Sequence, residues 1–213
     1  SLVAERVRGA AERADAFRVI VSLEERRLVA MDGADTLLVA PVAVGMDTTI
    51  RYGARRWTFQ TPRGVRAVLR KDRDPVWIPP DWHYAEVASK RGLALAWLRP
   101  GRPVRLSGGR TLVMRDGRAG VVLPEGDYGE LPVDEEIIFD DTLYVPPPGS
   151  ENRRIPGELG RFRLDMGDGY LLHGTPYEDS VGSNVTHGCI RLYDADIEWL
   201  YDHVPVGTKV YIY

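Results

Sequence analysis

Alternation of apolar and polar residues dominates this chain and predicts a mainly β protein. The segment RVIVSLEERRLVAMDG, residues 18–33, places Val19, Val21 and Leu23 at alternate positions and then continues into a second apolar run. A period of two is typical of strands that bury one face. The segment therefore predicts a β-hairpin that ends near Gly33.

Further short strands are expected along the rest of the chain, separated by turn-forming residues. TLLVAPVAVG (36–45) predicts a strand whose proline marks an edge or a bulge, and WTFQTPRGVRAVLRK (57–71) predicts strand, turn and strand. Gly-Gly and Asp-Gly sequences between 102 and 129 predict more hairpins. GRFRLDMGDGYLLHGT (160–175) predicts another hairpin, and KVYIY (209–213) predicts a closing strand.

Three segments have helical spacing instead. Residues 1–17 carry a narrow apolar stripe and predict an N-terminal helix or linker. PPDWHYAEVASKRG (79–92) predicts a helix with Asp81 as N-cap and Gly92 as its end, and DADIEWLYDHVPVG (194–207) predicts a helix capped by Asp194. The remaining chain, 18–213, is expected to form one mainly β domain with a minor α component.

Composition narrows the class of protein. The chain has 213 residues, 44% of them hydrophobic, which suffices for one domain with a sizeable core. The formal net charge is −3, which argues against a nucleic-acid partner, and no run of 18 apolar residues predicts a membrane span. Basic residues concentrate in 51–73 and acidic ones in 125–141. We interpret these as two solvated faces, with an anionic ligand or an acidic flap as the alternatives.

The stretch HGTPYEDSVGSNVTHGCIRL, residues 173–192, holds the only cysteine and two of the four histidines. A cysteine attacks as the thiolate, and an imidazole nearby can accept its proton. His187 and Cys189 are two residues apart, so on an extended strand they share a face. His173 lies sixteen residues before Cys189 at the end of an apolar run, and the turn-rich loop between them is long enough to bring them together.

Two other interpretations of this stretch remain open from the residues alone. One is a buried cysteine beside two hydrogen-bonded histidines, because free cysteine is among the most buried residue types. The other is a zinc site formed by His173, His187 and Cys189, although the His-x-Cys spacing is not a usual zinc pattern.

The order His-Gly-Thr, a loop, and then Thr-His-Gly-Cys-Ile-Arg resembles the signature of the L,D-transpeptidase catalytic domain, the YkuD-like family of peptidoglycan cross-linking enzymes. The hairpin at 18–33, the Thr-Pro-Arg-Gly segment at 61–64, the strand pair before His173 and the chain end at 192–213 are also similar to the family. The resemblance covers about 18–99 and 156–213. It implies a β-sandwich with short helices and an inserted subdomain or lid at about 100–155. This insertion and Thr186, where Ser is commoner, are the departures from the family pattern.

The resemblance also implies residue roles. Cys189 matches the nucleophile and His173 the general base, while the N–H groups of Gly188 and Cys189 would bind the oxyanion. His187 matches the second histidine of the motif, which orients substrate or supports the oxyanion site. Arg191 is expected to bind a carboxylate or to brace the loop, Thr186 to hydrogen-bond locally, and Gly174 to let the chain turn. No metal and no cofactor are implied.

The implied reaction is acyl transfer on peptidoglycan stem peptides. The thiolate attacks the L,D-bond of a tetrapeptide donor, forms a thioester and passes the acyl group to an amine, which gives a 3-3 cross-link. The same site would support L,D-carboxypeptidase activity, D-amino-acid exchange or attachment of a wall protein, and a non-catalytic wall-binding module is a further alternative. The resemblance also implies acylation by carbapenems and a location in the periplasm or cell envelope.

Overall fold

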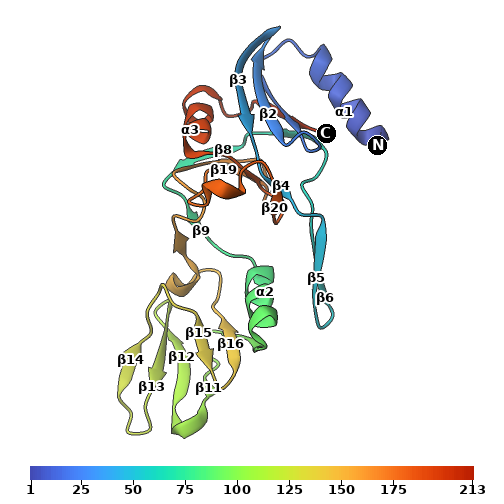
Figure 1. Cartoon of the computed structure of the whole chain (residues 1–213). Helices are drawn as coiled ribbons and strands as arrows, with labels where there is room; N and C mark the ends of the chain where they lie inside the picture. The colour runs from blue at the N-terminus through green and yellow to red at the C-terminus, as the bar shows by residue number, and fades with distance from the viewer. The chain divides into compact units, whose positions relative to one another are not determined.

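The computed structural model describes residues 1–213, and most of its regular structure is β-strand, with three α-helices (Figure 1). The chain forms two compact units. The first comprises Ser1–Thr49, Arg56–Pro75 and Pro156–Tyr213, and the second comprises Ile50–Arg55 and Val76–Ile155. The prediction of a mainly β protein with short helices is confirmed.

A five-stranded sheet forms one layer of the first unit. The hairpin expected at 18–33 is present, and its first strand pairs in parallel with the closing strand of the chain. The strand order is β3 (Asp35–Pro41), β2 (Arg27–Asp32), β1 (Arg18–Ser22), β22 (Lys209–Ile212) and β7 (Gly64–Ala67).

A four-stranded sheet forms the second layer and ends at the cysteine motif. Its order is β21 (Ile190–Arg191), β19 (Leu171–His173), β18 (Phe162–Asp165) and β8 (Arg70–Arg73). The outer pair β19–β21 is parallel, and the other pairs are antiparallel. One short pairing completes the unit, β4 (Val44–Gly45) with β20 (Asn184–Thr186). The residues of the hairpin β5 (Thr48–Tyr52) and β6 (Arg55–Phe59) are divided between the two units. The loop before β20 contains the 3-10 turn η3 (Glu178–Ser180).

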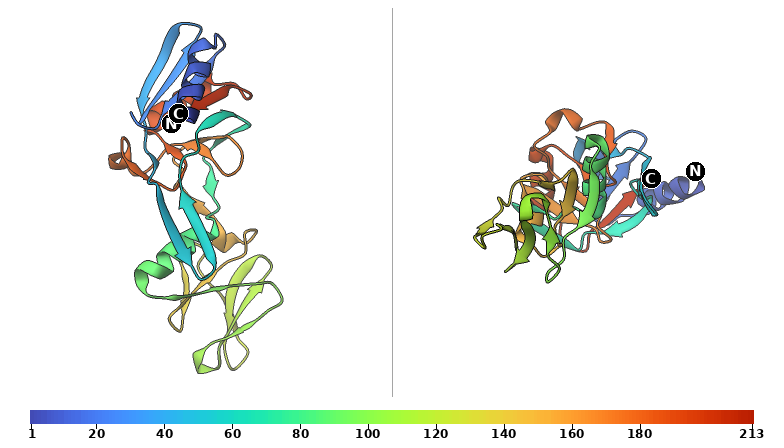
Figure 2. Two further views of the ribbon diagram at one scale, coloured as in Figure 1. Left: turned by 90° about the vertical axis from the view of Figure 1, so that its right-hand side faces the viewer. Right: turned by 90° about the horizontal axis from the view of Figure 1, so that it is seen from below.

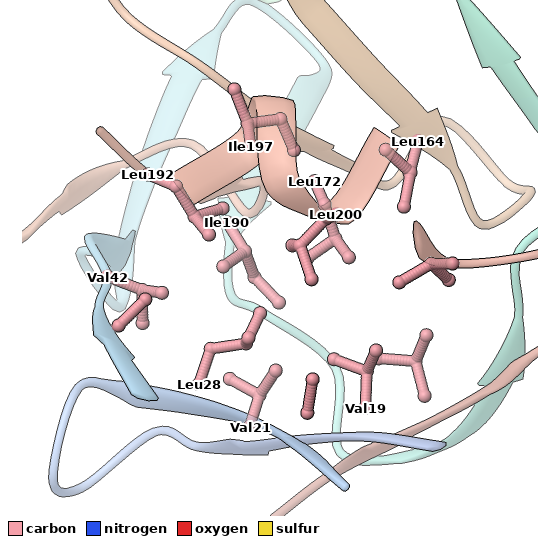
Figure 3. Close-up of a cluster of buried hydrophobic side chains, with 14 of the residues drawn as sticks. Val19, Val21, Leu28, Val42, Leu164, Leu172, Ile190, Leu192, Ile197 and Leu200 are labelled. Carbon is pink, nitrogen blue, oxygen red and sulfur yellow. The ribbon is translucent and has the colours of Figure 1, made fainter. Parts of the chain in front are cut away.

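The core of this unit lies between the two sheets and under helix α3 (Asp194–His203). Alternate residues of each strand point into it, including Val19 and Val21 from β1 and Leu172 from β19, all with no exposed surface. Figure 3 shows these side chains meeting those of α3. Helix α1 (Leu2–Arg13) covers the other face of the five-stranded sheet, where its Val7 and Ala11 pack on Tyr211 of β22. Both chain ends lie on this unit (Figure 2).

The second unit has its own small cores. A three-stranded sheet, β10 (Ala94–Trp97), β16 (Thr142–Val145) and β15 (Ile137–Phe139), packs against α2 (Asp81–Arg91). An antiparallel sheet follows, built from β11 (Val104–Arg105), β12 (Thr111–Arg115), β13 (Arg118–Val122) and β14 (Tyr128–Glu130). The remaining elements are β9 (Val76–Trp77), which pairs with β17 (Ile155–Pro156), η1 (Ser107–Gly109) and η2 (Glu151–Arg153). The residues expected as an insertion, about 100–155, belong to this unit.

Two expected helix caps are wrong. Asp81 and Asp194 are each the first helical residue, preceded by Pro80 and Tyr193 as N-caps. Their carboxylates are used elsewhere, because Asp81 binds Arg153 at 2.9 Å and Asp194 accepts from the N–H of Thr175. These two carboxylates therefore bind partners outside their own helices and do not cap the helices. None of the three helices is long and apolar enough to cross a membrane.

Candidate active site

His173 ends β19 with its side chain on the face of the four-stranded sheet that is turned away from the core. Its neighbour Leu172 points into the core, so His173 points to the opposite face. The imidazole is buried, with 5% of its surface exposed. Its Nδ1 lies at hydrogen-bonding distance from the carbonyl of Gly174. A carbonyl only accepts, so Nδ1 carries the proton and Nε2 keeps a free lone pair.

Cys189 comes directly before β21 and shares that outer face. β21 pairs with β19 in parallel register, with Ile190 opposite Leu172, so Cys189 lies beside Leu171. The thiol is half-buried, and its sulfur lies 3.7 Å from the carbonyl oxygen of Gly169. The sulfur is thereby turned over the start of the strand that carries His173 at its end. The fold brings together on one face the two residues that the sequence assigned as nucleophile and base.

The electrostatics of the pair favour the neutral forms. Burial lowers the pKa of His173 to about 4, assisted by the positive charge of Arg191 and partly opposed by the bond to Gly174. Burial raises the pKa of the Cys189 thiol to about 11, opposed by a backbone hydrogen bond at Leu171 and by the charge of Arg191. A thiol and a neutral imidazole are therefore the resting pair at pH 7.

Thr61 orients the peptide bond in front of the thiol. Its hydroxyl accepts from the N–H of Gly45 at 3.0 Å and donates to the carbonyl of Gly188 at 2.9 Å. In a trans peptide the N–H that follows points away from the carbonyl, so the N–H of Cys189 faces away from Thr61. That N–H donates to no acceptor in the protein. It is available to bind a developing oxyanion at the sulfur.

Gly188 is required at its position for two reasons. Its φ of +119° is unfavourable for any residue with a side chain. A Cβ there would lie 3.0 Å from the carbonyl oxygen of Gln60 and 3.3 Å from the ring of Tyr170. Any side chain would therefore push the loop that carries the thiol out of place.

Thr186 closes the loop locally, as expected. Its hydroxyl donates to the carbonyl of Cys189 at 2.6 Å and accepts from the N–H of Gly188 at 3.3 Å. The N–H of Gly188, which the sequence assigned to the oxyanion site, is thus already engaged. The open donor at this site is the N–H of Cys189.

His187 and Arg191 flank the pair. The His187 ring packs edge-on against Phe59, with 4.6 Å between ring centroids, and is half-buried. Arg191 lies opposite His173 in the strand register and donates to the hydroxyl of Ser180 at 2.9 Å. Burial lowers the pKa of Arg191, and its Nε has no partner. Arg191 thus braces the loop before the motif and also places a positive charge near the thiol.

Gly174 leaves room for the carboxylate of Asp194. Its φ is not positive, and a Cβ would lie 2.2 Å from Oδ1 of Asp194. Gly160 faces the same carboxylate, with 2.6 Å between its added Cβ and Oδ1. The two glycines let Asp194 approach the backbone that positions the carbonyl partner of His173.

Metal binding has no support from these side chains. No group of three or more His, Cys, Asp or Glu residues is arranged to hold a metal ion, so His173, His187 and Cys189 do not form such a set. A cavity of about 500 Å³ in this unit contains none of those three residues but is lined by Gly45, Gln60 and Thr61 among others, of which Thr61 also binds the carbonyl of Gly188.

Sequence reasoning gave no role to several residues that shape the site. Thr61 contacts the motif from a distant part of the chain, and Tyr170 and Asp194 contact it from just before and just after it in sequence. Thr61 belongs to the Thr-Pro-Arg-Gly segment noted for its family similarity, which was the one available signal. Asp194 was expected as a helix cap, and Tyr170 carried no sequence signal.

Comparisons with known proteins agree with the motif. A family model described as the L,D-transpeptidase catalytic domain, YkuD, matches residues 16–212. The probable L,D-transpeptidase ErfK/SrfK of Salmonella typhimurium is 29% identical over 195 residues, which are 91% of this chain and 43% of that protein. The probable L,D-transpeptidase YbiS of Escherichia coli is 28% identical over 195 residues, 90% of this chain and 42% of that protein.

A solved structure is similar as well. It is L,D-transpeptidase 3 from Mycobacterium tuberculosis in complex with a faropenem-derived adduct, with 19% identity, a TM-score of 0.47, and coverage of 92% of this chain and 60% of that chain. The chain spans less than half of the length of the two curated relatives. Because the family match runs through both sheets and the cysteine motif, this protein belongs to the family of L,D-transpeptidase catalytic domains.

Proposed function

We propose that this domain is a cysteine-dependent acyltransferase that acts on peptidoglycan tetrapeptide stems. The observation that carries the proposal is the shared sheet face of His173 and Cys189, with the proton of the imidazole placed on Nδ1 by the Gly174 carbonyl. This leaves Nε2 as the acceptor for the thiol proton. Family membership supports the same class of reaction.

The first half-reaction forms a thioester. The sulfur of Cys189 attacks the carbonyl carbon of the third residue of the donor stem while its proton passes to Nε2 of His173. The carbonyl oxygen becomes an oxyanion and is bound by the N–H of Cys189. Collapse of this intermediate breaks the bond to the terminal D-amino acid, whose amine leaves with the proton held by His173.

The second half-reaction returns the enzyme to its starting state. The amine of a second stem attacks the thioester carbonyl and gives one proton to His173. The carbon–sulfur bond then breaks, an amide cross-link forms, and the sulfur recovers the proton from the imidazolium. Water in place of the amine gives L,D-carboxypeptidase activity, and a free D-amino acid gives exchange.

The neutral resting state of Cys189 and His173 determines when the proton is transferred in the proposed reaction. With the pKa of the thiol raised and that of the imidazole lowered, an ion pair before substrate binding costs free energy. Proton transfer is therefore coupled to attack on the carbonyl, and the hydrogen-bonding groups around the oxyanion supply the stabilisation that solvent does not.

The proposed substrate sets the location. Peptidoglycan stems are outside the cytoplasmic membrane, so we place the protein in the periplasm or cell envelope, with a role in cell-wall structure and cell shape. A β-lactam carbonyl is an acyl donor of the same chemical type, so carbapenems are expected to acylate Cys189. A faropenem-derived adduct is present in the related Mycobacterium tuberculosis structure.

The test is mass spectrometry of the protein after incubation with purified tetrapeptide muropeptides and, separately, with a carbapenem. Wild type should give cross-linked, trimmed or exchanged muropeptides and a protein adduct with the carbapenem. Cys189→Ala should give neither, while Glu198→Gln, which changes an exposed side chain on α3 and leaves the thiol and its neighbours intact, should still form the adduct. An adduct on Cys189→Ala, or none on wild type, would contradict the proposal.

A non-catalytic wall-binding module is the remaining alternative. It predicts that the protein binds isolated sacculi while the thiol forms no acyl adduct. Binding of sacculi by wild type and Cys189→Ala alike, with no adduct on either, would favour it over the enzyme.

A further inference from the structure

The cavity of about 500 Å³ in the first unit carries charged side chains that have no partner in the protein. Glu24, Asp47 and Arg63 line it and are exposed, and none of the three side chains forms an ion pair or a hydrogen bond. Leu23 and Pro62 add apolar surface to the wall. Sites for small molecules have volumes of about 300–1,000 Å³. The cavity therefore has the size and the uncommitted polar groups of a ligand site.

Charges of opposite sign flank the end of β22 at this cavity. The turn that carries Glu24 is bonded to one side of the strand, because the N–H of Leu23 donates to the carbonyl of Tyr213 at 2.8 Å. On its other side β22 pairs with β7, which begins directly after Arg63. Glu24 and Arg63 are thus separated by two strand spacings, about 10 Å between backbones.

This arrangement of charges fits a short zwitterionic peptide. An extended peptide of three residues is about 10 Å long, with an ammonium group at one end and a carboxylate at the other. Its ends match Glu24 and Arg63, and Asp47 adds a second negative charge to the wall. A polyanion would be repelled by the two carboxylates, and a simple cation would leave Arg63 without a partner.

The wall of the cavity also holds the loop that carries the thiol. Thr61, which lines the cavity, donates to the carbonyl of Gly188 at 2.9 Å, and the N–H of Met46 donates to the carbonyl of Thr186 at 3.0 Å. Gly45 is in tight contact with the Thr61 segment, because a Cβ on Gly45 would lie 2.7 Å from the Thr61 nitrogen. A ligand that bridges this wall therefore also restrains the open N–H at the sulfur.

We propose that this cavity is a regulatory site for a short zwitterionic peptide, with Glu24 binding its ammonium group and Arg63 its carboxylate. Occupation of the cavity speeds acylation of Cys189, because a restrained loop loses less conformational freedom when its N–H binds the oxyanion. The binding site goes beyond the proposed function, and its effect on acylation rests on that function.

Calorimetry of the whole chain with three peptides tests the site. Triglycine carries both charges, N-acetyltriglycine lacks the ammonium group, and triglycine amide lacks the carboxylate. Wild type should bind triglycine about fivefold more tightly than either derivative, which is the upper end for an exposed ion pair. Arg63→Gln should no longer distinguish triglycine from its amide, and Glu24→Gln should no longer distinguish triglycine from its N-acetyl form.

The matched control is Arg161→Gln, which removes an exposed arginine outside the cavity. This variant should bind the three peptides as wild type does. Thermal unfolding of each variant shows whether it is folded.

The effect on the active site is measured as the initial rate of carbapenem acylation with and without triglycine. Wild type should react about fivefold faster when saturated with the peptide, at the lower end of couplings between two sites. Arg63→Gln should have the wild-type rate without peptide and should need about fivefold more triglycine for half of the increase.

Three results would overturn the inference. No binding of triglycine, or equal affinities of wild type for the three peptides, would remove the site. Unchanged discrimination in both Arg63→Gln and Glu24→Gln would place the peptide elsewhere. Peptide binding with no change in the acylation rate would remove the regulation. If wild type forms no carbapenem adduct at all, the proposed function fails, whereas the calorimetry still decides whether the cavity binds the peptide.

Discussion

The two faces of the four-stranded sheet use the same backbone for opposite purposes. The inner face presents Phe162, Leu164, Leu172 and Ile190, each with at most 1% of its surface exposed. The outer face presents Arg163, Asp165, His173 and Arg191, together with Cys189, from the same strands. The inner face stabilises the fold by removing apolar surface from water. The outer face holds polar groups at fixed spacing. Burying ionisable groups and leaving the Nε of Arg191 unpaired lower the stability of the fold, and the apolar burial on the inner face offsets this loss.

The most severe disruption of the outer face is His173→Ala. It removes the proton acceptor, so we expect the rate of acylation by a carbapenem to fall by on the order of 10³, the usual size of a general-base effect. Stopped-flow or mass-spectrometric kinetics measure this rate. His203→Ala is the control, because that histidine is exposed on α3 and should leave the rate unchanged. A fall of less than tenfold in His173→Ala would remove the base from the mechanism.

The matching disruption of the inner face is Leu172→Ala, one residue away. It leaves a cavity in a fully buried cluster, so we expect the free energy of unfolding to fall by about 3 kcal/mol. Urea unfolding followed by tryptophan fluorescence measures the loss. Activity per folded molecule should fall much less than in His173→Ala. Equal loss of activity in the two variants would mean that the faces are not separable.

The pH dependence of stability tests the burial of His173. Its folded pKa is about 4, below the ordinary value of 6.5, so the unfolded chain takes up a proton first as pH falls. The neutral imidazole therefore makes its full contribution to the free energy of unfolding above pH 6.5. As pH falls to about 4, the free energy of unfolding decreases by about 3 kcal/mol. Wild type should lose more stability across that window than His173→Gln. The charge of Arg191 also lowers the pKa of His173. If the free energy of unfolding of the two proteins varied with pH in the same way, His173 would not be a neutral buried imidazole.

The smallest effect that we predict concerns Thr61, whose hydroxyl joins Gly45 to the loop that carries Cys189. Thr61→Val keeps the shape of the side chain and leaves the Gly45 N–H and the Gly188 carbonyl without their partner. We expect a loss of about 2 kcal/mol in the free energy of unfolding. The carbapenem acylation rate should also fall, because the Cys189 N–H is no longer held in direction. Thr58→Val, at an exposed hydroxyl on the neighbouring hairpin, is the control and should change neither quantity.

Periodicity determined much of the fold from the sequence alone. The alternation in residues 18–33 predicted the first hairpin, and GRFRLDMGDGYLLHGT predicted the β18–β19 pair, because each strand needs one apolar face whatever its partner. The helix caps failed for the opposite reason. Asp81 and Asp194 have the right chemistry for a cap, but their partners Arg153 and Thr175 are distant in sequence or lie across a loop.

The candidate site divides in the same way. The order of His173, Gly188 and Cys189 along the chain resembles the family signature, and this resemblance named a nucleophile and a base, because reactive residue types and a specific spacing are properties of the sequence. Tertiary structure alone decided that Thr61 directs the open N–H, that Arg163 lies opposite His173 and that Asp165 lies in the row of Cys189. It also decided that thiol and imidazole rest uncharged. Strand register and burial set these properties, and both depend on residues that only folding brings together.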